Sequence, residues 1–238
     1  GRLGRRMSNL RIGIIGAGSM GVVLARHLAK RGYRVSIANS RGPESLIALA
    51  AGIGATPVSV VAAAKAGEIV VLAIPTKAVA ELPRGLFANV PGSVVVIDIG
   101  NYHPELRDGR IDAIDQGLLD SQWVAQQIGR PVIKAFNNIF ASSLLEKGVP
   151  KGTSGRIALS VAGDSLDAKA AVLRLVDELG FEPVDGGVLD DSWRQQPGTP
   201  AYCRDLDVAA LRRALAAADP SRVAEYRAEE EARIRRSF

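Results

Sequence analysis

Short apolar runs alternate with helix-spaced apolar positions along the first 136 residues. Runs rich in β-branched residues predict five strands, at residues 10–15, 33–38, 68–74, 93–99 and 131–136. Helical spacing over residues 19–30, and shorter patterns at 43–51 and 59–66, predict helices between these strands. Continuous apolar runs are typical of parallel strands that are buried on both faces. The pattern therefore predicts an α/β fold with a Rossmann-like, doubly wound and mostly parallel sheet.

The pattern changes after residue 136. Residues 137–154 contain Gly148, Pro150 and Gly152 and predict a loop. A further β-α-β unit and two terminal helices are predicted at residues 156–162, 166–179, 181–184, 206–217 and 220–236. In the last helix the pairs Glu229 with Arg233 and Glu231 with Arg235 indicate a solvated face. We therefore expect two domains, residues 7–136 and a smaller α/β domain over residues 137–238.

Composition and charge exclude several classes of protein. Hydrophobic residues make up 47% and charged residues 23% of the 238 positions, as in ordinary globular proteins. The net charge of +5 depends on three arginines in residues 1–6, which precede Met7 and are expected to be a cloning remnant; without them 27 Lys and Arg face 25 Asp and Glu. Cys203 is the single cysteine, and no apolar run approaches the ~20 residues that span a bilayer. We expect a cytoplasmic protein without nucleic-acid or membrane partners.

The strongest chemical signal joins the first predicted strand to the first helix. It is the run Gly16, Ala17, Gly18, Ser19, Met20 and Gly21. In a G-x-G-x-x-G motif the first glycine allows a tight turn, the second lets the backbone approach a pyrophosphate, and the third allows close helix–strand packing. The free amides of the helix N-terminus then face the phosphates. The position of the motif predicts dinucleotide binding.

The end of the second predicted strand indicates which dinucleotide binds. An NAD site usually carries an acidic residue here, whereas an arginine accommodates the 2′-phosphate of NADP. This chain has Asn39, Ser40 and Arg41, with no acidic residue before Glu44. Arg41 can form a charge-assisted bidentate contact with a phosphate. The sequence therefore predicts NADP(H) as the cofactor.

Several of these segments together resemble one family. They are GAGSMG at 16–21, NSR at 39–41, AIP at 73–75, KAFN at 134–137 and VDGGVL at 184–189. The chain resembles the NADP-dependent oxidoreductases of the coenzyme F-420 (deazaflavin)-dependent type. This resemblance implies hydride transfer between the nicotinamide and a flavin- or deazaflavin-like electron acceptor, with coenzyme F-420 or a flavin as second substrate. It also implies that the smaller C-terminal domain holds the acceptor.

The resemblance also implies residues near the nicotinamide. Ile74 and Pro75 would pack on the ribose side of the nicotinamide. Asn101 and Tyr102 follow the strand at 93–99, and Asn137 and Asn138 follow the strand at 131–136. In open α/β sheets ligands bind at the carboxyl ends of the strands. We expect no metal site and assign no residue to catalysis, because the segments expected to rim the crevice, residues 73–76, 100–102 and 136–138, contain no His, Lys, Asp, Glu or Cys.

Two other functions remain open from the sequence. One is a non-catalytic NADP(H)-binding sensor or partner protein. The other is a short relative of the 3-hydroxyacid dehydrogenases, which resemble this chain in their glycine motif but carry a long helical second domain with a catalytic lysine. The β segments after residue 136 count against this relative. A homodimer is expected because closed twofold assemblies are common.

Overall fold

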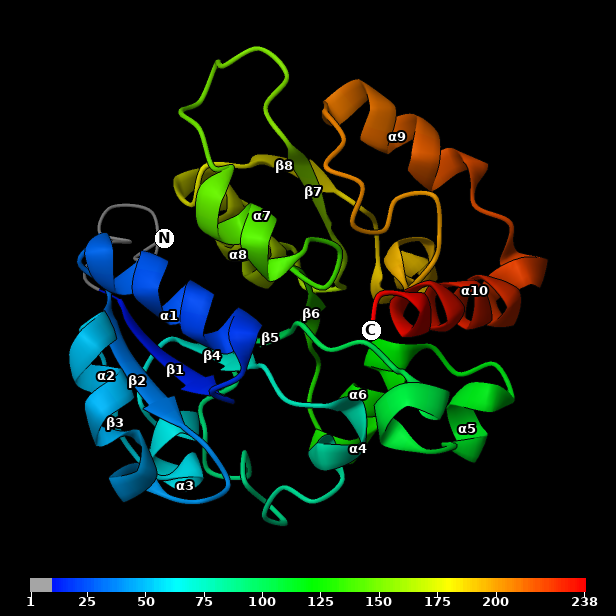
Figure 1. Cartoon of the computed structure of the whole chain (residues 1–238). Helices are drawn as coiled ribbons and strands as arrows, with labels where there is room; N and C mark the ends of the chain where they lie inside the picture. Colours follow the sequence, from blue (N-terminus) through cyan, green and yellow to red (C-terminus); the bar gives the residue numbers. More distant parts are fainter. Residues whose placement is uncertain (1–9) are drawn as a thin grey trace.

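The computed structural model describes residues 10–238 (Figure 1), so the expected cloning remnant at 1–6 lies outside the described residues. Six parallel strands form one sheet in the order β3-β2-β1-β4-β5-β6. They are β1 (Arg11–Ile15), β2 (Arg34–Ala38), β3 (Thr56–Pro57), β4 (Ile69–Leu72), β5 (Val95–Asp98) and β6 (Ile133–Lys134). This is the strand order of the doubly wound dinucleotide-binding fold, which confirms the predicted fold class.

Helices cover both faces of this sheet (Figure 1). Two of them, α1 (Ser19–Lys30) and α2 (Ile47–Ile53), share one apolar core with β1 and β2. On the other face α3 (Val60–Ala64), α4 (Thr76–Val79) and α6 (Asp120–Ile128) share a second core with β4 and β5. Every residue of β4 is buried, as expected for a strand between two helical layers.

The chain after β6 forms a smaller layer beside α1. A parallel pair of strands, β7 (Ala158–Val161) and β8 (Glu182–Asp185), packs with α8 (Leu166–Glu178). The backbone of Lys134 exchanges two hydrogen bonds with Ala162, of 2.8 and 3.1 Å, and so links β6 to the end of β7. The predicted β-α-β unit is therefore present, and it is hydrogen-bonded to the main sheet. The domain boundary after residue 136 stays a prediction.

Several short elements depart from the sequence pattern. The loop predicted at residues 137–154 contains α7 (Ala141–Glu146), which packs against α1. The remaining short segments are the 3₁₀ turns at Pro43–Leu46, Leu189–Gln195 and Pro220–Arg222, a π turn at Pro104–Asp108, and α5 (Asp112–Asp115). Elements of three to seven residues contain too few turns to show a helical period, so tertiary contacts rather than periodicity define them.

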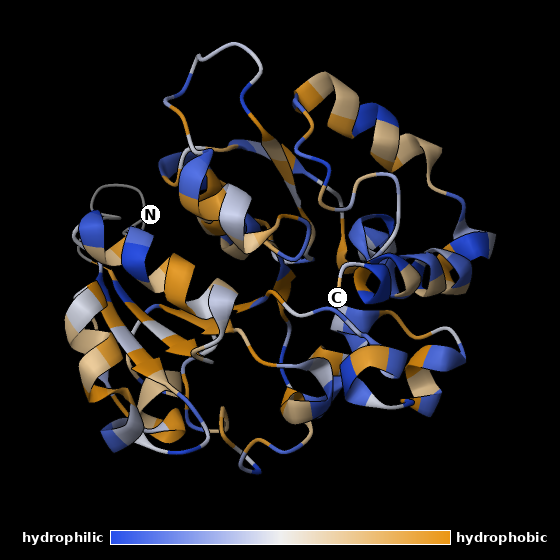
Figure 2. Cartoon of the chain, in the orientation of Figure 1, coloured by the Kyte–Doolittle hydropathy of each residue, from blue (hydrophilic) through white to orange (hydrophobic). Residues whose placement is uncertain are grey.

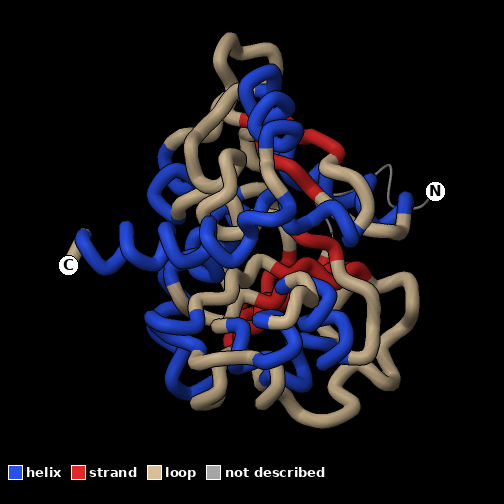
Figure 3. Tube along the Cα trace, turned by 90° about the vertical axis from the view of Figure 1, so that its right-hand side faces the viewer, coloured by secondary structure: helices blue, strands red, loops and turns tan. Residues whose placement is uncertain are grey.

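Of the two terminal helices, α9 (Val208–Ala217) packs on β7, and α10 (Val223–Arg236) lies against the turn at Pro104–Asp108. Hydrophilic residues predominate along α10 (Figure 2), and its C-terminal end projects from the molecule (Figure 3). Nevertheless α10 buries Arg227, Glu230 and Glu231. The Glu231 carboxylate accepts hydrogen bonds of 2.9 Å from the backbone amides of Glu105 and Leu106. The predicted solvated position of Glu231 is therefore wrong. Within residues 10–238 no helix has the length and apolar character to cross a membrane.

Candidate cofactor-binding site

A cleft of about 710 Å³ lies at the carboxyl ends of β1, β2 and β4. Three of the predicted segments meet there. The predicted residues that line it are Gly16, Ala17, Gly18, Asn39, Ser40, Ile74 and Pro75. Parallel strands that end at one edge of the sheet bring these distant segments together.

The three glycines of the motif have three different surroundings. Gly16 has a φ of +123°, and a Cβ there would lie 2.1 Å from the carbonyl oxygen of Ala73. A Cβ on Gly21 would lie 2.2 Å from the carbonyl oxygen of Gly16, so the helix packs tightly on the turn. A Cβ on Gly18, in contrast, would meet nothing within 4 Å. Protein packing therefore requires glycine at 16 and 21, whereas Gly18 leaves open space in the cleft for a ligand.

The N-terminus of α1 begins at this open space. Gly18 caps the helix without a side-chain hydrogen bond, and the first turn carries no acidic residue. The amides of Ser19, Met20 and Gly21 lie in the first turn, where backbone amides have no intrahelical acceptor. Their partial positive charge is not neutralised by a protein carboxylate, and it suits a phosphate. The predicted pyrophosphate cradle has the open space and the donors that a dinucleotide needs.

The loop after β2 is held by its own side chains. The Asn39 side chain accepts a hydrogen bond of 3.1 Å from the Arg41 amide and donates one of 3.0 Å to Ser45 Oγ. Asn39 and Ser40 line the cleft, whereas the exposed Arg41 lies beside them in the same turn. Within residues 10–238 the Arg41 guanidinium has no ion-pair or hydrogen-bond partner. An arginine in this state can pair with a 2′-phosphate without breaking an existing contact.

The opposite wall of the cleft was not found from the sequence. It is built by Ser59, Val60 and Val61 at the start of α3, by Ala78 within α4, and by residues 81–83 after α4. Ser59 is the N-cap of α3, where its Oγ accepts the Ala62 amide at 3.1 Å. The apolar members of this wall, Val60, Val61 and Leu82, are suited to the flat adenine ring. The only available signal was their position after β3 and after β4, at the same edge of the sheet.

The residues predicted after β5 and β6 do not line this cleft. Asn101 and Asn137 contact each other: Asn137 Nδ2 donates to Asn101 Oδ1 at 3.0 Å, and Asn101 Nδ2 donates to the Asn137 carbonyl at 2.9 Å. Asn137 is also bonded in both directions to Gln195. Asn138 donates to Ser160 Oγ at 2.9 Å. These amides join the sheet edge to the C-terminal part, so their predicted role as nicotinamide contacts stays a prediction.

Tyr102 does not line this cleft either, and its predicted role as a cofactor contact stays a prediction. Its side chain is 0% exposed. The hydroxyl donates to Asp115 at 3.0 Å and accepts the Ile111 amide at 2.8 Å. The sequence argument placed Tyr102 correctly after β5, but it could not show that the ring turns under α5.

A buried charged group lies directly below the end of β5. Asp98 accepts hydrogen bonds from Ser121 Oγ at 2.7 Å and from the Gly100 amide at 2.9 Å. Lys134 Nζ, with no exposed surface, donates to Ser121 Oγ at 2.8 Å. Burial raises the pKa of Asp98, and the Lys134 charge opposes this shift. The group fixes the backbone of Gly100, which leads into Asn101.

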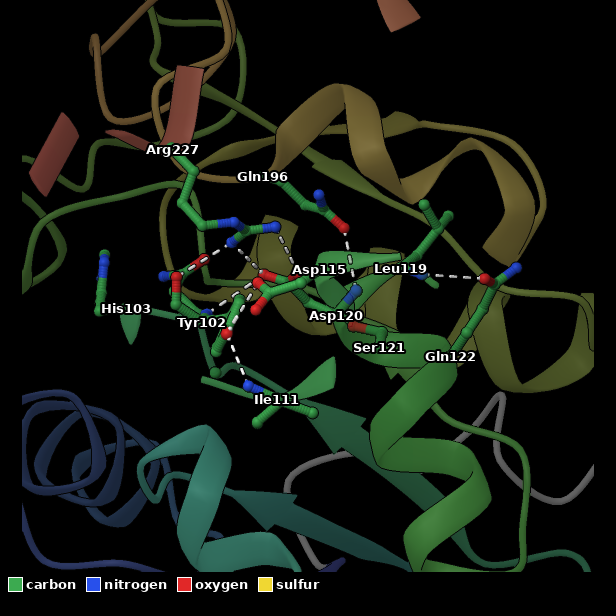
Figure 4. A network of polar contacts seen from close by, with 12 residues as sticks. Tyr102, His103, Ile111, Asp115, Leu119, Asp120, Ser121, Gln122, Gln196 and Arg227 are labelled. Carbon is green, nitrogen blue, oxygen red and sulfur yellow. Dashed lines mark hydrogen bonds and ion pairs between the residues drawn. The ribbon is translucent and has the colours of Figure 1, made fainter. Parts of the chain in front are cut away.

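A second buried group ties α10 to the same segment (Figure 4). Arg227 makes two hydrogen bonds to the Asp120 carboxylate, of 2.8 and 3.0 Å, and a third of 2.9 Å to the Tyr102 carbonyl. Asp120 also accepts the Tyr102 amide at 3.1 Å. Burial alone would raise the pKa of Asp120. The positive charges of Arg227 and Lys134 have the larger, opposite effect, so the pKa of Asp120 lies below its ordinary value. Asp120 and Arg227 thus form a buried ion pair that holds the segment after β5.

Neither the nearby histidine nor the cysteine is prepared for proton transfer at neutral pH. Burial, followed by the charge of Arg107, lowers the pKa of His103 to about 4. Burial raises the pKa of the Cys203 thiol to about 12. Within residues 10–238 no group of three or more His, Cys, Asp or Glu side chains could hold a metal ion.

The strand order and the glycine turn define a Rossmann-type α/β protein, and comparisons with known proteins narrow this class. The family described as "NADP oxidoreductase coenzyme F420-dependent" matches residues 11–102. The protein YjhV of Escherichia coli (strain K12) is 46% identical over 67 residues, which are 28% of this chain and 49% of that protein. This chain therefore matches about half the length of that relative.

Solved structures extend the likeness beyond the first half. A hypothetical protein from Sinorhizobium meliloti is 31% identical, with a TM-score of 0.70, over 87% of this chain and 98% of that one. A candidate F420-dependent NADP reductase from an Arthrobacter species is 22% identical, with a TM-score of 0.63, over 77% and 87% of the two chains. At this identity the Arthrobacter structure shows the fold alone. The chain belongs to the family of NADP oxidoreductases of the coenzyme F420-dependent type, as the resemblance predicted.

Proposed function

We propose that this protein is an NADP(H)-dependent oxidoreductase that transfers hydride between the nicotinamide and a flavin- or deazaflavin-like small molecule. The observation that carries the proposal is the cleft itself. Its open glycine, Gly18, lies at the N-terminus of α1, and the free Arg41 lies after β2. Family membership supports the same cofactor.

The residues of the cleft supply binding and orientation. The first-turn amides of α1 and the guanidinium of Arg41 would hold the phosphates, and Ile74 and Pro75 would pack against the ribose and nicotinamide end. NADPH, when bound, supplies the hydride. Apolar walls exclude water and hold two planar rings in contact, and positioning of this kind can account for several kcal/mol of a barrier.

The type of acceptor follows from the acid–base groups. A carbonyl reductase needs a proton donor near the developing alkoxide, whereas a flavin-type ring can take its proton from solvent. The titratable groups nearest the β5 and β6 ends, Asp98 and Lys134, are buried and hydrogen-bonded to Ser121. The hydroxyl of Tyr102 is bonded to Asp115. The arrangement therefore favours an acceptor that needs no protein acid.

A panel of acceptors tests this proposal. We expect NADPH oxidation with FMN, FAD or a deazaflavin, and none with small ketones or imines. Tyr102→Phe should retain turnover within a factor of about 3, because the 10²–10⁴-fold contribution of a general acid is not expected from a buried hydroxyl. Turnover only with ketones or imines would contradict the acceptor. Tight NADPH binding without oxidation by any acceptor would favour the non-catalytic sensor.

The assembly of the protein is a separate proposal. We retain the predicted homodimer, and light scattering on the purified chain would test it.

A further inference from the structure

The cofactor cleft contains one charged side chain that the proposed function does not use. Among the described residues that line the cleft, Glu81 is the only one with an ionisable side chain. It follows α4, and its backbone amide donates to the Ala78 carbonyl at 3.0 Å. The side chain is exposed, and within residues 10–238 its carboxylate has no ion-pair or hydrogen-bond partner. A free hydrogen-bond acceptor is therefore available in the cleft.

The position of this carboxylate limits what it can bind. The phosphate-binding end of the cleft consists of the first turn of α1 and the loop after β2, and neither contributes an acidic residue to the lining. Glu81 belongs instead to the opposite wall, together with Val60, Val61 and Leu82. A carboxylate repels phosphate groups, so it is compatible with a dinucleotide only at the end that holds a base. The negative charge is thus located where the apolar wall is suited to adenine.

The edge of an adenine ring offers a partner for such a carboxylate. A carboxylate can only accept hydrogen bonds. The exocyclic N6 amino group of adenine is a donor, whereas the neighbouring N7 is an acceptor. Hypoxanthine carries a carbonyl oxygen in place of this amino group, and that oxygen would face the carboxylate as acceptor against acceptor. A carboxylate beside the ring edge can therefore distinguish the two bases.

We propose that Glu81 is a specificity-determining residue, whose carboxylate accepts a hydrogen bond from the N6 amino group of the adenine of NADP(H). This role rests on the proposed function, because it requires the adenine ring to lie against the wall of Val60, Val61 and Leu82. Two side chains of opposite charge then recognise the adenosine part. Arg41 binds the 2′-phosphate, and Glu81 binds the amino group of the base.

The matched ligand for testing this role is the reduced hypoxanthine analogue of NADPH, which differs from NADPH in the base alone. Its 2′-phosphate and pyrophosphate are unchanged, so the contacts of Arg41 and of α1 contribute equally to both nucleotides. Titration followed by the fluorescence of the dihydronicotinamide gives both affinities. We expect the wild type to bind NADPH at least about 5-fold more tightly than the analogue, the value of one hydrogen bond to an exposed charged group.

Glu81→Gln tests the residue itself. The glutamine amide can accept from the amino group of adenine or donate to the carbonyl oxygen of hypoxanthine. The preference for NADPH should therefore fall to within about 2-fold. Removal of a charge alone would change both affinities by the same factor. The ratio of the two affinities thus isolates the hydrogen bond from the charge.

Glu44→Gln is the matched control. It removes the same charge from the turn after β2, next to Gly42, but Glu44 does not line the cleft, so the ratio should stay at the wild-type value. Equal wild-type affinities for the two nucleotides, or an unchanged ratio in Glu81→Gln, would overturn this role and leave the proposed function intact. Failure of both nucleotides to bind the wild type would contradict the proposed function, and the role of Glu81 with it.

Discussion

Two regions at the carboxyl edge of the sheet differ in whether their polar groups are free or paired within the protein. At β1 and β2 the first-turn amides of α1 and the Arg41 guanidinium are free, and Gly18 opens onto a cleft. At β5 and β6 the polar groups are more numerous, but they pair with one another: Asp98 with Ser121, and Asp120 with Arg227. Similar strand ends therefore serve two purposes.

The difference separates ligand binding from structural support. Free donors at an exposed edge are solvated, and a phosphate can replace that water at small cost. Buried charges cannot remain free, so each one needs an internal partner. The polar groups of the β5–β6 region thus bind one another and fix the backbone from Gly100 to Tyr102. Those of the β1–β2 region remain free to bind a ligand. Mutations in the two regions should accordingly affect stability and cofactor binding separately.

The largest expected effect is on stability, in the β5–β6 region. Arg227→Met leaves the Asp120 carboxylate, which is 1% exposed, without its counter-charge. We expect a loss of about 3–5 kcal/mol in the free energy of unfolding, measured by urea denaturation. The matched control is Arg222→Met, which removes an exposed pair with Glu225 on the same part of the chain and should change stability far less. Equal losses in both variants would show that the buried pair has no special structural role.

Gly18→Val should have the opposite profile. The side chain enters open space, so the protein should stay folded, but it occupies the place that a pyrophosphate needs. We expect NADPH affinity to fall by about 100-fold or more, which corresponds to ~2.7 kcal/mol. Gly92→Val, also in open space but before the amino end of β5, is the control and should bind NADPH normally. A Gly18→Val variant with unchanged affinity would remove the cleft from cofactor binding.

A smaller effect concerns the pH dependence of stability. The pKa of His103 is held at about 4 in the folded protein, below the ordinary value of 6.5, chiefly by burial. Between these two values the unfolded chain binds a proton that the folded chain does not, so stability falls as the pH is lowered from about 6.5 toward 4. We expect this group to account for about 2 kcal/mol between pH 6.5 and 5.

Urea denaturation of the wild type and His103→Gln at pH 7, 6 and 5 measures this contribution. The variant should lose less stability on acidification than the wild type, while its NADPH turnover at pH 7 should be retained. Parallel stability curves for the two proteins would contradict the assigned protonation of His103.

The sequence predicted the cleft after β1 and β2, whose residues follow their strands directly. It did not predict the contacts of the β5–β6 region, whose partners lie far apart in the chain. The glycine motif, the loop at Asn39 to Arg41 and the turn at Ile74 and Pro75 each follow a predicted strand directly. The order of the strands in the sheet brings the three segments together. Their positions needed only the strand pattern and the rule that ligands bind at carboxyl strand ends.

The β5–β6 region depends on partners far apart in the chain. Asp120 and Arg227 are 107 positions apart, and Glu231 caps amides 125 and 126 positions away. No local period marks such contacts, so a helix as polar as α10 was expected to face solvent. The surroundings of Tyr102 could not be predicted for the same reason, because the contact between its hydroxyl and Asp115 requires the fold of the intervening segment.

The central claim is that the free groups after β1 and β2 bind the phosphates of NADP(H), and Arg41 offers the most direct measurement. Titration of NADPH and NADH, followed by the fluorescence of the dihydronicotinamide, gives both affinities for the wild type and for Arg41→Ala. We predict that the wild type binds NADPH more tightly than NADH. We also predict that Arg41→Ala loses about 1.5–3 kcal/mol of NADPH binding, the value of a charged hydrogen bond, with NADH unchanged. Equal wild-type affinities, or equal losses for the two nucleotides, would contradict the account.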